Sequence, residues 1–149
     1  MSEDEKWMQI AIEEAIKASS EGEVPVGAVL VKDGELIAQA HNQPIQKNDA
    51  SAHAEIQLLR IAGKKTNNYR LNNMTMYITL EPCIMCLGAI MNARISKIIY
   101  GAHDLKIGAY RSYINLNNSK CFQHKLDVTG GVLENKCKTL LQDFFKIRR

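Results

Sequence analysis

Residues 74–100 read MTMYITLEPCIMCLGAIMNARISKIIY and contain two apolar runs separated by a helical pattern. The runs at 74–80 and 95–100 are rich in β-branched and aromatic residues, which is typical of strands. Between them Pro82 suits the start of a helix, and apolar residues recur at three- and four-residue intervals through 86–93. The segment predicts strand, helix, strand, and a helical crossover allows the two strands to be parallel.

The segments on either side extend this pattern. In order along the chain they predict a helix over 6–18, a hairpin with strands at 26–31 and 36–40, a helix over 52–62 that stops at Gly63, a short strand at 126–129 and a final helix over 133–144. Residues 101–123 mix glycine, asparagine and charge, and we expect a long functional loop there. Helices that separate a hairpin from three later strands predict a sheet covered on both faces, in the α/β class.

The composition is that of one globular domain over residues 1–149, with 46% hydrophobic and 23% charged residues. The chain contains no run of roughly 18 to 20 apolar residues, and its acidic start at 1–5 is unlike a signal peptide. We therefore expect a cytoplasmic protein with no membrane segment. The net charge of +3 is too small to indicate nucleic-acid binding by itself.

Cys83 and Cys86 lie three residues apart at the predicted start of a helix. This spacing places both sulfurs on one side of the first turn, where one metal ion can bind both. His53 opens another predicted helix and offers a third ligand, which leaves one tetrahedral position for water. Glu55 follows two residues later, and its carboxylate can carry protons between that water and a substrate. The four residues predict a catalytic zinc site, in which the water becomes a nucleophile near neutral pH.

Two other functions fit a Cys-x-x-Cys pair at a strand-to-helix junction. A thioredoxin-like redox site presents the same motif. A structural zinc site would need a fourth protein ligand, and the candidates are Cys121, Cys137, His41, His103 and His124. The upstream His-x-Glu favours the catalytic interpretation, because two such motifs, each at a predicted helix start, seldom coincide by chance.

Further motifs accompany these two. His-x-Glu followed by Pro-Cys-x-x-Cys is the signature of zinc deaminases that act on nucleobases. The chain also contains EVPVGA at 23–28, Asn42, AHAE at 52–55, NYRL at 68–71, TLEPC at 79–83 and DFF at 143–145. With these motifs it resembles the bacterial tRNA-specific adenosine deaminases, within the cytidine/deoxycytidylate deaminase superfamily, over nearly its whole length.

The resemblance implies a three-layer α/β/α cytidine deaminase-like fold with a five-stranded mixed sheet, and a homodimer with one Zn²⁺ per subunit. It also implies hydrolysis of adenosine to inosine at the wobble position of a tRNA, an arginine tRNA with an ACG anticodon. Zinc-bound hydroxide would attack adenine C6 while Glu55 shuttles protons, and ammonia would leave. The partner would be the anticodon loop, whose unpaired bases cost less to extrude than paired ones.

The same resemblance assigns roles to individual residues. His53, Cys83 and Cys86 would hold zinc, and Glu55 would be the catalytic proton shuttle. Asn42, after the hairpin, would bind the flipped adenine. The remaining substrate contacts would be Asp104, Lys106, Phe145 and Arg149, at the anticodon bases.

One departure from the family pattern lies after Gly108 and Ala109, where small residues are usual and this chain has Tyr110-Arg111. This departure does not affect the predicted zinc ligands. It bears on the shape of the neighbouring substrate-binding rim or of the subunit interface. The nearest rival function is deamination of a free base or nucleoside, since the zinc motifs do not select the base. The basic tail at 145–149 favours RNA.

Overall fold

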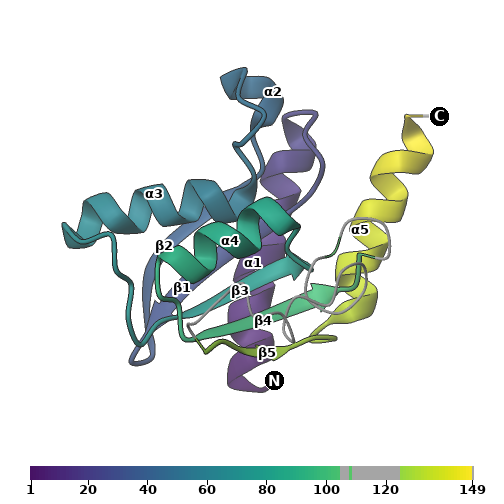
Figure 1. Ribbon diagram of the computed structural model, residues 1–149. Helices are drawn as coiled ribbons and strands as arrows, with labels where there is room; N and C mark the ends of the chain where they lie inside the picture. Colours follow the sequence, from purple (N-terminus) through teal and green to yellow (C-terminus); the bar gives the residue numbers. More distant parts are fainter. Residues whose placement is uncertain (105–107, 109–124, 149) are drawn as a thin grey trace.

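The computed structural model describes residues 1–104, 108 and 125–148. These residues form a five-stranded mixed sheet with the order β2-β1-β3-β4-β5 (Figure 1). The strands are β1 Gly27–Lys32, β2 Glu35–His41, β3 Thr75–Leu80, β4 Lys97–Ala102 and β5 Asp127–Thr129. β1 runs antiparallel to β2 and β3, whereas β3, β4 and β5 are mutually parallel. The predicted hairpin, mixed sheet and parallel later strands are confirmed.

Helices cover both faces of the sheet, as predicted. Helices α1 (Glu3–Ser20) and α5 (Glu134–Ile147) lie on one face, and α3 (Ala54–Thr66) and α4 (Ile84–Asn92) on the other (Figure 1). Successive residues of β1 point to opposite faces: Ala28 and Leu30 pack with α3 and α4, and Val29 and Val31 pack with α1. The fold has three layers, α/β/α.

Two features of the elements differ from the sequence prediction. Helix α3 continues through Gly63 and ends at Thr66, because Asn67 adopts the left-handed conformation (φ 53°) that closes the helix. The four-residue helix α2 (Pro44–Lys47) was not predicted, since four residues are too few for a periodic pattern. Most of the predicted long loop, residues 105–107 and 109–124, lies outside the described residues. Within the part of the chain that the structure describes, no helix is long and apolar enough to cross a membrane.

Helix α1 approaches β1 most closely at Gly27. A Cβ there would lie 2.6 Å from the Ala15 backbone nitrogen and 2.8 Å from the Glu14 Cβ, and would overlap the Ala11 carbonyl oxygen. Because these atoms belong to a packed helix, we expect Gly27→Ala to lower the free energy of unfolding by about 3 kcal/mol in urea denaturation. Gly88→Ala is the control. A Cβ at Gly88 meets no atom within 4 Å, so this variant should gain about 0.5–1 kcal/mol from helix propensity. If the two substitutions changed the free energy of unfolding equally, the close contact between α1 and Gly27 would be contradicted.

Candidate active site

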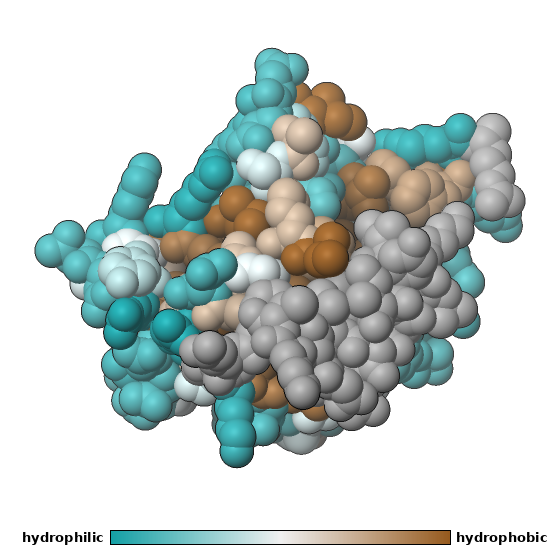
Figure 2. All heavy atoms as spheres, viewed as in Figure 1, coloured by the Kyte–Doolittle hydropathy of each residue, from teal (hydrophilic) through white to brown (hydrophobic). Residues whose placement is uncertain are grey.

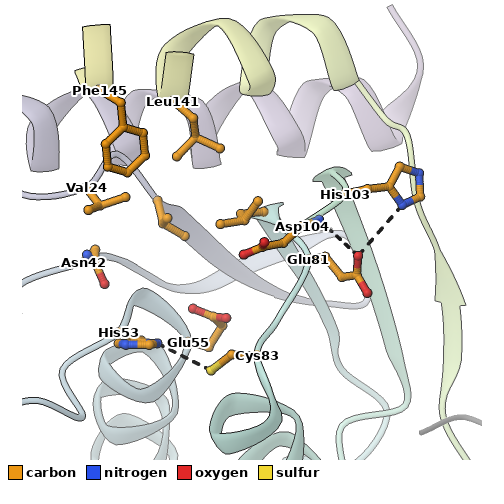
Figure 3. Close-up of a pocket in the computed structure, with 12 residues that line it drawn as sticks. Val24, Asn42, His53, Glu55, Glu81, Cys83, His103, Asp104, Leu141 and Phe145 are labelled. Carbon is orange, nitrogen blue, oxygen red and sulfur yellow. Dashed lines mark hydrogen bonds and ion pairs between the residues drawn. The ribbon is translucent and has the colours of Figure 1, made fainter. Parts of the chain in front are cut away.

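His53 and Cys83 each sit at the first position of a helix. His53 is the N-cap of α3 and Cys83 is the N-cap of α4, both in extended backbone conformation. Neither side chain caps its own helix, so the imidazole and the thiol remain available for a ligand. The two helices contact each other on one face of the sheet, and both N-termini lie at the same pocket (Figure 3). Helix N-termini carry a partial positive charge, which favours thiolate ligands.

The ligand atoms of His53, Cys83 and Cys86 all lie within 4.8 Å of one another. His53 Nδ1 is 3.7 Å from Cys83 Sγ and 3.5 Å from Cys86 Sγ. A tetrahedral zinc ion, with its sulfur and nitrogen ligands at their usual bond lengths, would separate nitrogen from sulfur by about 3.5 Å. The nitrogen–sulfur distances therefore fit a bound zinc ion.

None of the described candidates for a fourth protein ligand joins this group. Cys137 is buried in the core between α1, α5 and the sheet. His41 contacts Glu14 and Glu21, and His103 lines the same pocket but contacts Tyr100 and Glu81. Cys121 and His124 fall outside the described ranges. Among residues 1–104, 108 and 125–148, only His53, Cys83 and Cys86 converge as a group of metal ligands, which leaves room for a water at a bound metal.

Hydrogen bonding distinguishes the two thiols. The bond from Cys86 lowers the pKa of Cys83 to about 4, with help from His53 and against the effect of burial. The pKa of Cys86 is raised, because its thiol hydrogen-bonds to Cys83 and is buried. The hydrogen bond to Cys83 raises the pKa of His53. Of the two thiols, Cys83 is the one whose ionisation these hydrogen bonds favour.

Glu55 lies in the first turn of α3, one residue beyond Ala54, and is only 4% exposed. Burial is the main influence on this carboxyl group and raises its pKa to about 7. Its side chain points into the same pocket as His53 and Cys83 (Figure 3). A carboxyl group in this position can exchange a proton with a molecule bound beside the three ligands.

The pocket has a volume of about 580 Å³, within the usual range for small-molecule sites. It brings together six of the predicted site residues, namely Asn42, His53, Glu55, Cys83, Asp104 and Phe145. Figure 3 shows Phe145, from α5, across the pocket from His53 and Glu55. Cys86 is fully buried behind this surface. Lys106, Arg149 and the unusual Tyr110-Arg111 pair lie outside the described residues.

Sequence reasoning missed the apolar walls of the pocket and a second buried acid. Val24, Val26 and Leu141 line the walls, and Glu81 lies beside Asp104. Val24, Val26 and Glu81 fall inside the quoted motifs, but apolar periodicity assigns the valines and Leu141 to the core. Only the tertiary arrangement shows that these side chains border a cavity.

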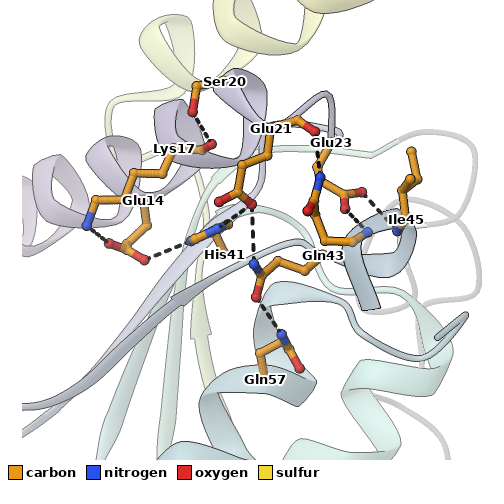
Figure 4. A network of polar contacts seen from close by, with 10 residues as sticks. Glu14, Lys17, Ser20, Glu21, Glu23, His41, Gln43, Ile45 and Gln57 are labelled. Atoms are coloured by element: carbon orange, nitrogen blue, oxygen red, sulfur yellow. Dashed lines mark hydrogen bonds and ion pairs between the residues drawn. The ribbon is translucent and has the colours of Figure 1, made fainter. Parts of the chain in front are cut away.

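A polar network holds His41, the residue that precedes Asn42 in the chain (Figure 4). His41 Nδ1 is 3.1 Å from Glu14 Oε1, and His41 Nε2 is 3.0 Å from Glu21 Oε1. Burial opposes ionisation of Glu14, but hydrogen bonds from Lys17 and His41 outweigh it and lower the pKa of this group. Residue 41 is thereby tied to α1.

A second set of contacts holds the segment that follows Asn42 in the chain. The Glu23 carboxylate is 1% exposed and accepts the backbone N–H groups of Ile45 and Gln46 at 3.2 and 2.8 Å. The Asn42 backbone N–H itself donates to the Val26 carbonyl at 3.0 Å. Since both flanks are anchored, the Asn42 side chain, 8% exposed, is directed into the pocket (Figure 3).

Comparison with known proteins agrees with this geometry. The chain matches the MafB19-like deaminase family over residues 2–149. It is 48% identical to the tRNA-specific adenosine deaminase of Haemophilus influenzae, over 98% of this chain and 85% of that protein. It is 44% identical to the tRNA-specific adenosine deaminase of Bacillus subtilis, over 98% of this chain and 91% of that protein. A solved structure from a study of A-to-I editing by tRNA:A34 deaminases at the wobble position of transfer RNA superposes with a TM-score of 0.89 at 41% identity, over 91% of this chain and 99% of that chain.

A buried carboxylate beside a His/Cys/Cys cluster, on a three-layer α/β/α fold, defines the class of hydrolytic deaminases. The identities extend over nearly the whole chain and over most of each relative. Within that class, the chain belongs to the tRNA-specific adenosine deaminase family.

Proposed function

We propose that this chain converts adenosine to inosine at the wobble position of a tRNA, by zinc-dependent hydrolysis with one zinc ion per chain. The substrate is an arginine tRNA with an ACG anticodon, and residues 1–149 act as a single domain in the cytoplasm. The observation that carries the proposal is the buried Glu55 carboxylate, which faces His53 and Cys83 in a pocket large enough for a nucleobase. Full-length similarity to tRNA-specific adenosine deaminases supports the choice of substrate.

His53, Cys83 and Cys86 would hold the zinc ion, whose fit follows from the distances between their ligand atoms. When bound, zinc lowers the pKa of water from about 16 to about 7 and so supplies a nucleophile near neutral pH. Glu55 would take one proton from the attacking water and deliver it to N1 of the adenine ring. It would then carry the remaining proton, from the new C6 hydroxyl, to the exocyclic amine. The C6–O bond forms, the C6–N bond breaks, and ammonia leaves.

The other pocket residues bind and orient the nucleotide. The Asn42 amide offers both a donor and an acceptor to the edge of the flipped base. Val24 and Val26 supply an apolar wall that excludes water from the reacting ring. Asp104 and Phe145, at the mouth of the pocket, would contact neighbouring anticodon bases, with Lys106 and Arg149 extending that surface.

The exposed face of α4 supports a homodimer. Ile84 and Met85 in its first turn are 54% and 38% exposed, and a groove lined partly by Ile56, Leu59 and Ala89 runs between α3 and the same helix. Figure 2 shows apolar side chains gathered over this part of the surface. Burial of such a surface against a second copy of the chain would stabilise a dimer. A chain that sediments as a monomer at assay concentrations would contradict this part of the proposal.

The proposal predicts inosine formation in an anticodon stem-loop with an ACG anticodon. The matched control RNA carries its adenosine one position away in the same loop. Free adenine, guanine, cytosine and their nucleosides are assayed in parallel. We expect turnover of the ACG stem-loop alone, measured by inosine content after nuclease digestion. Turnover of free bases or nucleosides without turnover of the stem-loop would overturn the RNA assignment and favour the rival function.

A further inference from the structure

Glu81 is a buried carboxylate that the deamination steps do not use. It follows the last residue of β3 and precedes the Pro-Cys motif, and its side chain is 0% exposed. Its backbone N–H donates to the carbonyl of Ala102, the last residue of β4, at 2.9 Å. Glu81 therefore stands between the segment that leads to the metal ligands and the segment that leads to the rim of the pocket.

The chain that leaves β4 turns around this carboxylate. The Asp104 backbone N–H donates to Glu81 Oε1 at 3.2 Å, and His103 Nδ1 lies 3.9 Å from the same oxygen (Figure 3). The Gly108 N–H donates to the Asp104 carbonyl at 2.9 Å, and Gly108 forms an antiparallel bridge with Cys83. The two described ends of this turn are thus fixed beside one buried acid.

Gly108 has no side chain, and the Glu81 carboxylate lies close to where a Cβ would otherwise be. A Cβ at this position would lie 2.6 Å from both Cδ and Oε1 of Glu81, and it would overlap the carbonyl oxygen of Asp104. A side chain at position 108 must displace either the turn or the carboxylate. Position 108 therefore lies against the Glu81 carboxylate with no room for a side chain.

The geometry points to Glu81 as a positioning residue that sets the RNA-facing rim of the pocket. Its carboxylate accepts the Asp104 N–H and holds the turn in place, so that the Asp104 side chain lines the pocket mouth. The inference rests on the proposed function, in which Asp104 contacts anticodon bases. Glu81 is not one of the three converging side chains, so replacing it removes no candidate metal contact.

The first test is Glu81→Ala, compared with Glu81→Gln, which keeps an acceptor oxygen in the same place. We expect the alanine variant to exchange the Asp104 amide proton about tenfold faster and to raise KM for the ACG stem-loop about tenfold. The zinc content should stay at one ion per chain, and kcat should change less than about threefold. The glutamine variant should lie between wild type and alanine in both amide exchange and KM.

The second test changes Gly108, which packs against the Glu81 carboxylate. Gly108→Ala should accelerate the same amide exchange, and its effect should be less than additive with Glu81→Ala, because both substitutions disturb the same contact between Asp104 and Glu81. Glu134→Gln and Gly88→Ala are the matched controls. Glu134 lies 3.8 Å from His103 Nε2 on its outer side, and a Cβ at Gly88 meets nothing. Both controls should leave Asp104 exchange unchanged.

Amide exchange needs no substrate, so it separates this inference from the proposed function. Wild-type protein that fails to deaminate the stem-loop would overturn the function, while the exchange data would still report on Glu81. Unchanged Asp104 exchange in Glu81→Ala would overturn the positioning role. So would equal effects of the glutamine and alanine variants, or additive effects of Glu81→Ala and Gly108→Ala.

Discussion

Glu55→Ala is expected to bind one zinc ion per chain and to deaminate the ACG stem-loop about 10³-fold more slowly than wild type. The carboxylate carries protons and is not one of the three converging ligands, so its loss removes proton transfer without removing a metal contact. Glu55 is buried and points into the pocket beside these side chains. The loss should appear in kcat more than in KM.

Single-turnover inosine formation and zinc content measured on the same preparation test this prediction. Glu55→Gln keeps the shape of the side chain but not its basicity, and it should be nearly as inactive as the alanine variant. Glu13→Ala, on the exposed side of α1, is the control for a lost acidic side chain and should be unaffected. If Glu55→Ala retained more than a tenth of the wild-type activity, the proposed role of Glu55 as proton shuttle would be wrong.

Cys83→Ala is expected to lose both zinc and activity. It removes one of three ligands, and two protein ligands bind zinc far more weakly than three. Cys86→Ala should behave in the same way. Cys137→Ala is the matched control, because Cys137 is buried in the core away from the cluster and its replacement should cost only about 1 kcal/mol of stability.

Metal analysis after dialysis distinguishes these variants. The prediction requires zinc near one equivalent in wild type and Cys137→Ala, and near zero in Cys83→Ala and Cys86→Ala. Full zinc content in Cys83→Ala would mean that the metal, where present, binds elsewhere. A fully active Cys83→Ala protein would remove the metal from the mechanism altogether.

Most of the fold followed from local pattern. The β1 and β2 hairpin was predicted from two apolar runs around Asp33-Gly34, and the parallel pairing of β3 with β4 from the helix between them. The end of α3 was wrong by a few residues. Glycine and asparagine can both end a helix, and only the backbone conformation shows that Asn67 does so rather than Gly63.

The candidate metal ligands and the adjacent carboxylate could be proposed from sequence because the geometry within each pair is local. A spacing of three at a helix start brings Cys83 and Cys86 together, and a spacing of two puts Glu55 next to His53. The other residues that line the pocket carried no comparable spacing in the sequence. Val24 and Leu141 look like any other apolar residue in the core, and Glu81 looks like a polar residue between a strand and a helix.

The sequence by itself therefore determined the order of the main helices and strands, the pairing of Cys83 with Cys86 and the closeness of Glu55 to His53, because spacing along one helix or strand dictates those relations. Only the tertiary structure decided that the N-termini of α3 and α4 meet, that Asn42 is held between two anchored flanks, and that Gly108 fits against Glu81. These relations join segments that lie far apart in the chain. They depend on how helices pack on the sheet and which buried polar groups find partners, and short-range periodicity carries no information about either.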